Sequence, residues 1–153
     1  MLPFLRSFRY AFRGLALCLR ERNFRFHLAL SAYMYGFLLA YDWFVLSRGE
    51  WAALILVTAL VLLAEAFNTA IEAIVDLVSP QRQPLAAKAK DVGAAAVLVC
   101  SIGAVAAGVT LLYQPAAFRA LWAYYQQRPG MFALLAVTLI GAAWFIWGIG
   151  RKK

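Results

Sequence analysis

The stretch AEAFNTAIEAIVD at residues 64–76 carries three of the seven acidic residues of the chain. It directly follows the apolar run WAALILVTALVLL. At 100° per residue, Glu65, Asn68, Glu72 and Asp76 share one helix face about 80° wide and rise through about 16 Å. The spacing therefore predicts a polar row that runs from apolar depth toward an aqueous surface.

The chemistry that this row suits differs with depth. An ionised carboxylate inside a membrane helix costs on the order of 2.5–3.5 kcal/mol, so the deepest acid, Glu65, is expected to have a role. A half-buried glutamate suits a general base for a hydroxyl group that arrives from lipid. Two carboxylates seven residues apart, here Glu65 and Glu72, with the amide of Asn68 between them, suit Mg²⁺, which prefers oxygen ligands and bridges carboxylates to nucleotide phosphates.

Other polar residues fall at the same predicted level, and each has a plainer alternative. Glu21 and the segment KAKD at 88–91 can complete a metal and phosphate site. The lysines of that segment also fit simple cytoplasmic anchors, and Asn68 also fits a hydrogen bond between helices. For His27, the only histidine, an interfacial role is favoured over a ligand role. The sequence contains neither GxxxxGK[ST] nor GxGxxG before a helix, the familiar nucleotide motifs.

Composition identifies the setting of these residues as a membrane. Of the 153 residues, 65% are hydrophobic and only 14% are charged, which predicts a membrane protein of one domain. The net charge of +8 favours an anionic membrane surface or a phosphate-bearing ligand over nucleic acid. Cys18 and Cys100 lack the spacing of a disulfide framework or a zinc site.

Four apolar stretches, at about 28–46, 51–74, 92–113 and 130–149, are each long enough to cross a hydrocarbon core of about 30 Å. The fold class predicted is an all-α membrane protein. In residues 4–20, phenylalanines and leucines gather on one helix side and arginines on another, which is typical of a helix in the headgroup layer. A charged flank that only fixes topology is the alternative. The segment SPQRQP at 79–84 predicts a loop, and an aromatic connector precedes the fourth span.

The distribution of Lys and Arg sets the expected orientation. With the N-terminus in the cytoplasm, twelve basic residues lie inside and only Arg48, Arg119 and Arg128 lie outside. Both termini and the acidic row are then cytoplasmic.

The quoted acidic stretch and the following AAKAKDVGAAAVL resemble the small integral-membrane lipid kinases of prokaryotes, the diacylglycerol kinase and undecaprenol kinase family. The patterns are E-x-x-N-[ST]-A-I-E-x-x-[VI]-D and A-K-D-x-[GA]-[SAG]-A-A-V, about a dozen residues apart. SFRYAFRGL and ERNFRFH are similar to the family as well, the latter more to the undecaprenol kinase branch. The resemblance covers about residues 4–113.

The resemblance implies a homotrimer in the bacterial inner membrane, each subunit having a surface helix and three spans, with cytoplasmic sites at subunit interfaces. ATP and Mg²⁺ enter from the cytosol and the lipid alcohol from the bilayer. Glu65 matches the catalytic base that meets the lipid, and Glu21 and Glu72 match metal-binding acids that also contact nucleotide. The residues that match further nucleotide contacts of the family are Tyr10, Gln81, Arg82, Gln83, Lys90 and Asp91. Asn68 and Asp76 match supporting polar positions of the same site.

The C-terminal part departs from the family. The fourth span, about 129–149, and the tail RKK lie outside the three-span core, although one domain over 1–153 is expected. Pro3 stands where some members have a basic residue. The leading hypothesis is an ATP- and Mg²⁺-dependent kinase of undecaprenol or diacylglycerol that needs no other protein partner. The alternatives are an oligomer that conducts protons or cations along the acidic face, and a scaffold held by the small-residue run at 93–108.

Overall fold

The computed structural model describes residues 2–81 and 83–148. These residues form helices and no strand. The helices are α1 Leu2–Cys18, α2 Arg22–Ala40, α3 Arg48–Val78, α4 Pro84–Leu112, α5 Pro115–Gln127 and α6 Pro129–Trp147. The all-α class predicted from the sequence is confirmed.

Local sequence explains where most of the helices begin. Ser47 and Glu50 form a capping box at the start of α3: the Glu50 N–H donates to Ser47 Oγ and the Ser47 N–H donates to Glu50 Oε2. The helices α4, α5 and α6 each have proline in the first turn, where the missing N–H has no intrahelical partner to lose. The loop predicted at SPQRQP lies between α3 and α4.

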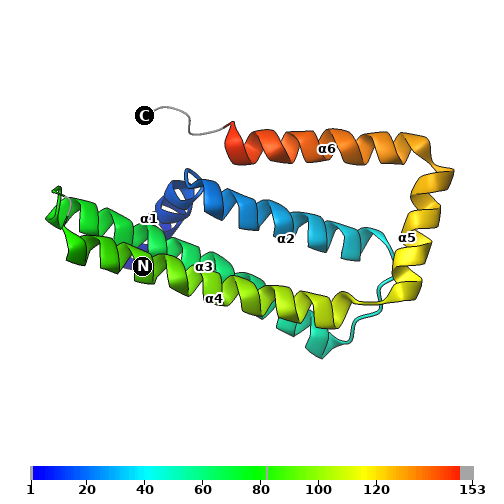
Figure 1. Cartoon of the computed structure of the whole chain (residues 1–153), viewed down its shortest axis with the longest axis horizontal. Helices are drawn as coiled ribbons and strands as arrows, with labels where there is room; N and C mark the ends of the chain where they lie inside the picture. The colour runs from blue at the N-terminus through cyan, green and yellow to red at the C-terminus, as the bar shows by residue number, and fades with distance from the viewer. Residues whose placement is uncertain (1, 82, 149–153) are drawn as a thin grey trace.

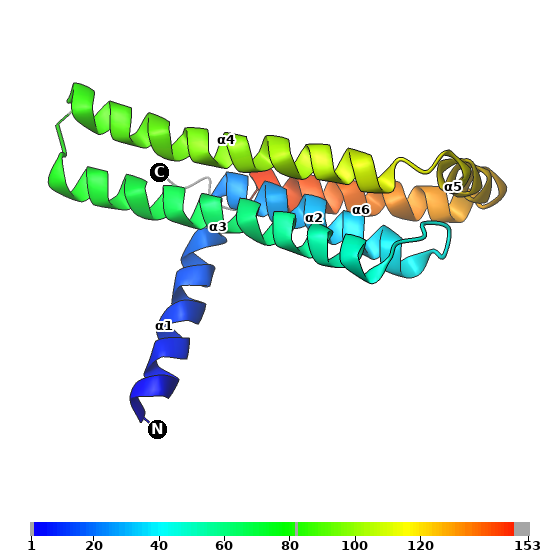
Figure 2. The ribbon, with the colours of Figure 1, turned by 90° about the horizontal axis from the view of Figure 1, so that it is seen from below.

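The helices α2, α3, α4 and α6 form a flat bundle, and α1 and α5 run at an angle to it (Figures 1 and 2). In Figure 1, α3 and α4 run side by side as a long hairpin, and α2 lies between this hairpin and α6. Figure 2 shows α1 leaving the bundle at a steep angle. The short α5 crosses the end of the bundle opposite the α3–α4 loop. Buried apolar side chains, among them Leu38, Leu54 and Val97, lie on α2, α3 and α4.

Three helices of the described residues are long and apolar enough to cross a membrane, namely α3 with 31 residues, α4 with 29 and α6 with 19. Their outward faces carry exposed apolar side chains such as Leu60, Val99 and Ile140, as expected for surfaces that meet lipid or another subunit. That α2 also crosses the membrane stays a prediction. Its place beside α3 and α6 supports it (Figure 1).

The boundaries correct the sequence prediction in two places. The first span was expected at 28–46, but α2 covers Arg22–Ala40 and Tyr41 has an extended backbone. The apolar residues after it contact the start of α5 instead: Phe44 packs edge-on against Phe118, and the side chain of Gln114, the N-cap of α5, bonds both the N–H and the carbonyl of Val45. The connector before α6 is itself a helix, α5, which was not predicted. The helices expected at 4–20 and 130–149 are confirmed as α1 and α6, and the tail RKK lies outside the described residues.

Candidate active site

Glu65, the deepest acid of the row, is buried against α2. Only 3% of the residue is exposed. Its Oε1 lies 3.4 Å from Nε2 of His27, in the second turn of α2. Thr69 donates a hydrogen bond from its hydroxyl to the Glu65 carbonyl at 3.0 Å. The carboxyl group is therefore enclosed by protein and faces the one histidine of the chain.

The position of His27 differs from the interfacial role favoured by the sequence. Its ring packs edge-on against Phe26 and turns inward to Glu65, with 18% of the side chain exposed. No local pattern signals this pair, because the two residues are far apart in the sequence. The usable signal was topological: α2 and α3 are antiparallel neighbours, so residues at comparable distances from their connection come side by side.

Asn68 and Glu72, one turn apart on α3, are joined by a hydrogen bond from Asn68 Nδ2 to Glu72 Oε1 at 2.8 Å. The other amide atom, Asn68 Oδ1, faces Gly93 on α4, where a Cβ atom would lie only 2.5 Å from it. Asn68 thus orients the carboxylate of Glu72 and also packs against α4 at Gly93. The alternative expected for Asn68, a hydrogen bond between helices, is not seen among the described residues, and its role as a site residue stays a prediction.

Asp76 and Lys90 form an ion pair across the tip of the α3–α4 hairpin. Both line a hollow of about 410 Å³ at this tip, together with Gln81 and Gln83 from the connecting loop. Four residues that the resemblance assigned to nucleotide or to the same site are therefore brought together. The hollow is open and partly polar. The tip of the α3–α4 hairpin, which bears its lining residues, extends beyond the start of α2 (Figure 1).

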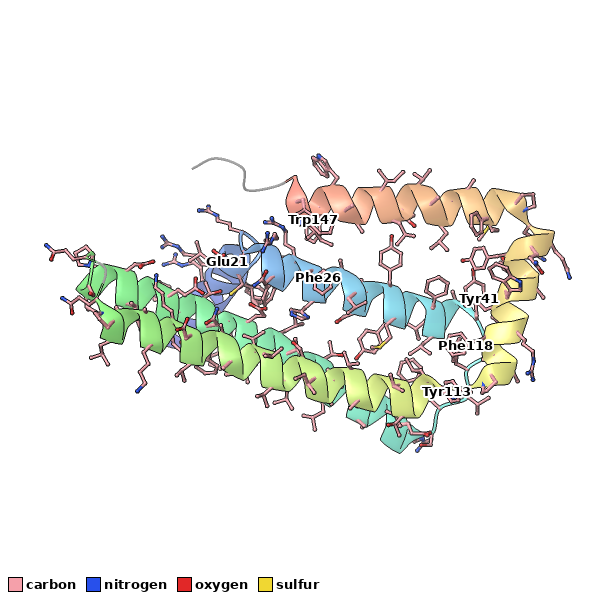
Figure 3. The ribbon with its side chains drawn as sticks, viewed as in Figure 1. Glu21, Phe26, Tyr41, Tyr113, Phe118 and Trp147 are labelled. Carbon is pink, nitrogen blue, oxygen red and sulfur yellow. The ribbon has the colours of Figure 1, made fainter. Side chains whose placement is uncertain are left out.

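Among the described residues, the remaining predicted ones form no hydrogen bond or ion pair with the acids of α3 and do not line the hollow. Glu21 precedes α2, is exposed, and lies within electrostatic range of Glu65, as does Glu72. Figure 3 shows Glu21 at the junction of α1 and α2. Tyr10 is exposed on α1, where it meets the guanidinium of Arg9, and Asp91 is exposed on α4 without lining the hollow. Arg82 lies outside the described residues.

The acids suit a metal that completes its shell with other ligands. Within residues 2–81 and 83–148, no three of His, Cys, Asp or Glu cluster closely enough to hold a metal alone. Mg²⁺ does not require such a cage, since it keeps several waters and binds one or two carboxylates plus phosphate oxygens. The bond from Asn68 uses one of the two carboxylate oxygens of Glu72. The oxygen donors of Glu21 and Glu72 therefore fit this cation.

A sequence profile of prokaryotic diacylglycerol kinase matches residues 9–112, well over half of the chain. The chain belongs to the prokaryotic diacylglycerol kinase family. By that membership it is a lipid kinase, and the alternative of an ion-conducting oligomer is not favoured. All the predicted site residues lie inside the matched range, whereas α5 and α6 lie outside it.

Three relatives are similar to the chain. It is 40% identical over 102 residues to the undecaprenol kinase of Bacillus subtilis, covering 65% of this chain and 79% of that protein. It is 39% identical over 111 residues to a diacylglycerol kinase of Synechocystis, covering 71% and 62%. It is 42% identical over 95 residues to a diacylglycerol kinase of Pseudomonas aeruginosa, covering 62% and 70%. No solved structure gives a significant match to the chain.

Proposed function

We propose that the protein transfers the terminal phosphoryl group of ATP to the hydroxyl group of a membrane lipid alcohol. The observation that carries this proposal is the gradient of burial along one face of α3. Glu65 is 3% exposed, Glu72 is half-buried, and the side chain of Asp76 is 67% exposed. The exposed end of the row suits a nucleotide arriving from water. The buried Glu65 suits a hydroxyl group arriving from the bilayer, which requires α2 and α3 to part at this point when the lipid binds.

In the proposed reaction Glu65 is the general base. Its carboxylate accepts the proton of the lipid hydroxyl as the oxygen forms a bond to the γ-phosphorus, while the bond from that phosphorus to the leaving ADP oxygen breaks. His27 is the positioning residue: its Nε2, 3.4 Å from Glu65 Oε1, holds the carboxyl group at the contact between α2 and α3. Phosphoryl transfer depends mainly on such positioning and on charge stabilisation.

Glu21 and Glu72 would hold Mg²⁺, which supplies neutralisation of the phosphate charge when bound. Asn68 fixes the orientation of the Glu72 carboxylate through its hydrogen bond. The hollow at the hairpin tip supplies Lys90 for phosphate oxygens and Asp76 to hold that lysine in place. The proposed nucleotide contacts also include Tyr10, Asp91 and the loop residues Gln81, Arg82 and Gln83.

The proposed acceptor is undecaprenol or diacylglycerol, in lipid-carrier or phospholipid recycling. Relatives of similar identity carry both names, and both lipids present a primary hydroxyl group at the membrane surface. The segment ERNFRFH, with Glu21 and His27 at its ends, supports undecaprenol as the first substrate to test.

We place the enzyme in the bacterial inner membrane as a homotrimer of single-domain subunits, with the N-terminus and the active site in the cytoplasm. The bias of Lys and Arg toward the acidic end of the bundle supports the orientation. The exposed apolar face of α4, with small residues at 93–108, supports contact with a second copy.

The testing experiment is a phosphorylation assay with radiolabelled ATP on purified protein in mixed micelles. Undecaprenol and diacylglycerol are offered separately and then in competition, each with and without Mg²⁺. Label in one lipid, dependent on Mg²⁺, is the expected result. Absence of label from both lipids at saturating ATP and Mg²⁺ would refute the proposal, and ion flux through liposomes containing the protein would then revive the conducting alternative.

A further inference from the structure

Arg25, in the first turn of α2, is only 2% exposed although it carries a full charge. Such a side chain is stable inside a protein when its donors are hydrogen-bonded. Arg25 bonds carbonyl oxygens in two separate parts of the chain, the turn between α1 and α2 and the last turn of α6. It therefore joins the two ends of the sequence at the end of the bundle that carries the acids.

The first set of bonds closes the turn before α2. Nη1 donates to the carbonyl oxygens of Leu19, at 3.1 Å, and Arg20, at 2.8 Å. The backbone N–H of Arg25 donates to the carbonyl oxygen of Glu21 at 3.1 Å. One residue thus holds three successive carbonyl groups, and the third belongs to the acid proposed to bind metal. The direction of the Glu21 side chain follows from this turn, because its backbone is fixed on both sides.

The second bond reaches α6. Nη2 donates to the carbonyl oxygen of Ile146 at 2.7 Å, and the guanidinium lies 6.0 Å from the ring of Phe145. The last carbonyl groups of a helix lack intrahelical partners and carry partial negative charge, so a buried cation is favourable there. Figure 3 shows Trp147, at the end of α6, and Glu21 at the same end of the bundle.

The helices α2 and α6 are neighbours in the bundle (Figure 1). Farther along, the two helices border an apolar hollow of about 460 Å³, lined by residues such as Gly36 and Leu134. Just beyond the end of α2, the hydroxyl group of Tyr41 meets that of Tyr125, on α5, at 3.2 Å. Within residues 2–81 and 83–148, the hydrogen bond from Arg25 to Ile146 links α6 to the acid-bearing end.

We infer that α6, the helix beyond the family match, braces the metal-binding turn through Arg25, which is a positioning residue for Glu21. The brace holds the α1–α2 turn closed and so fixes the backbone from which the Glu21 side chain extends. This inference rests on the proposed role of Glu21 in metal binding. Loosening the brace then weakens the use of Mg²⁺ while lipid binding and the base are untouched.

The test uses the full-length protein with Arg25→Lys, Phe145→Ala and the double variant. Arg25→Lys keeps the charge but loses the planar fork that bonds both sets of carbonyls. The readout is the Mg²⁺ concentration at half-maximal activity, with ATP and lipid saturating. Each single variant should raise it several-fold with little change in kcat, and the double variant should add little beyond the larger single effect. An unchanged Mg²⁺ requirement, or effects that multiply, would overturn the inference.

Two further variants distinguish loss of the brace from a general loss of folding and from a failure of the proposed function. Trp144→Ala is the matched control, since this ring is 67% exposed beside Phe145, and it should leave the Mg²⁺ requirement unchanged. Glu21→Gln tests the metal role directly: no shift there refutes that role, whereas a shift there with none in Arg25→Lys refutes the brace.

The turn itself is probed by thiol labelling in a Cys100→Ser background. Cys18 is buried at the end of α1, and its carbonyl accepts the Glu21 N–H. Arg25→Lys and Phe145→Ala should each speed the labelling of Cys18 by a maleimide several-fold, with or without Mg²⁺, while Trp144→Ala should not. Equal labelling rates in all variants would contradict a brace at this turn.

Discussion

The two ends of the helical bundle are held by different chemistry. At one end the contacts are single polar links, such as His27 with Glu65 and Lys90 with Asp76. At the other end, rings pack in a cluster: Tyr41 stacks on Trp43 at 4.6 Å between centroids, and both meet Tyr124 edge-on at 5.3 Å. Figure 3 shows Glu21 at the first end and Tyr41, Tyr113 and Phe118 at the second.

This difference indicates how each end responds to substitution. Aromatic pairs contribute about 0.5–1.5 kcal/mol each beyond buried area, so removing one member of a cluster leaves the others in place. A carboxylate with one orienting partner has no such redundancy. We therefore expect large losses of activity at the polar end, and small losses of stability without loss of activity at the aromatic end.

The largest expected effect is that of Glu65→Gln. Gln keeps the size of the side chain but does not accept the hydroxyl proton, so lipid phosphorylation should fall by about 10²–10⁴-fold. Nucleotide binding, measured by fluorescence of an ATP analogue, should stay close to wild type. The matched control is Glu50→Gln, at the other end of α3. Glu50 belongs to a capping box, and a glutamine at this position can also complete it. Equal losses of nucleotide binding and phosphorylation in Glu65→Gln would refute the assignment of the base.

The next largest effect is expected for Glu72→Gln. Loss of a carboxylate ligand should raise the Mg²⁺ concentration at half-maximal activity by about 10-fold or more. High Mg²⁺ should restore much of the rate, because the base is intact. In Glu50→Gln the Mg²⁺ requirement should match wild type, and an unchanged requirement in Glu72→Gln would remove this residue from the metal site.

Gly93→Ala should act on stability and metal use together. The added Cβ would lie 2.5 Å from Asn68 Oδ1, so either α4 shifts or the Asn68–Glu72 bond breaks. Overpacking of this kind costs about 1–3 kcal/mol. Gly141→Ala on α6 is the matched control, because nothing lies within 4 Å of the added atom, and it should be neutral or slightly stabilising. The thermal midpoint and the Mg²⁺ titration measure the two effects, and a wild-type midpoint in Gly93→Ala would show that the contact is not tight.

At the polar end, the arrangement of the acids could be predicted from the sequence, but the residues that contact them could be predicted less well. Helical spacing places Glu65, Asn68, Glu72 and Asp76 on one face, and the structure shows the expected gradient of exposure along it. The contact of Glu65 with His27 joins two helices, and no periodicity within either helix encodes such a pair.

The aromatic end was predicted least well, for a related reason. The apolar composition after residue 40 favours a continuing span, yet α2 ends at Ala40 because ring stacking and the bonds from Gln114 stabilise an extended segment. The helix α5 is rich in aromatic residues, and its hydrogen-bonding partners lie far away in the sequence. Tertiary contacts therefore override a composition that is ambiguous locally.

The smallest expected effect is that of Tyr125→Phe at the aromatic end. The substitution removes the hydroxyl group that meets Tyr41 at 3.2 Å but keeps the ring contacts, so the free energy of unfolding should fall by only about 0.5–1.5 kcal/mol. The hydrogen bond to Tyr125 is the main cause that raises the pKa of Tyr41 in the folded protein. The bond therefore contributes to the free energy of unfolding at pH values below about 10, the ordinary pKa of tyrosine. This contribution is lost as the pH rises through the raised pKa of Tyr41 in the folded protein. The difference from wild type should thus be constant between about pH 6 and pH 9.

Thermal unfolding in micelles measures this difference, with Tyr113→Phe as the control because Tyr113 is 73% exposed. Phosphorylation by Tyr125→Phe should equal that of wild type. A several-fold loss of activity would mean that the aromatic end communicates with the acids through α2 or α6, and the two ends would then have to be treated as one cooperative unit. A loss of stability confined to Tyr125→Phe, with full activity, fits ends that act independently, one in catalysis and one in holding α5 and α6 to the kinase core.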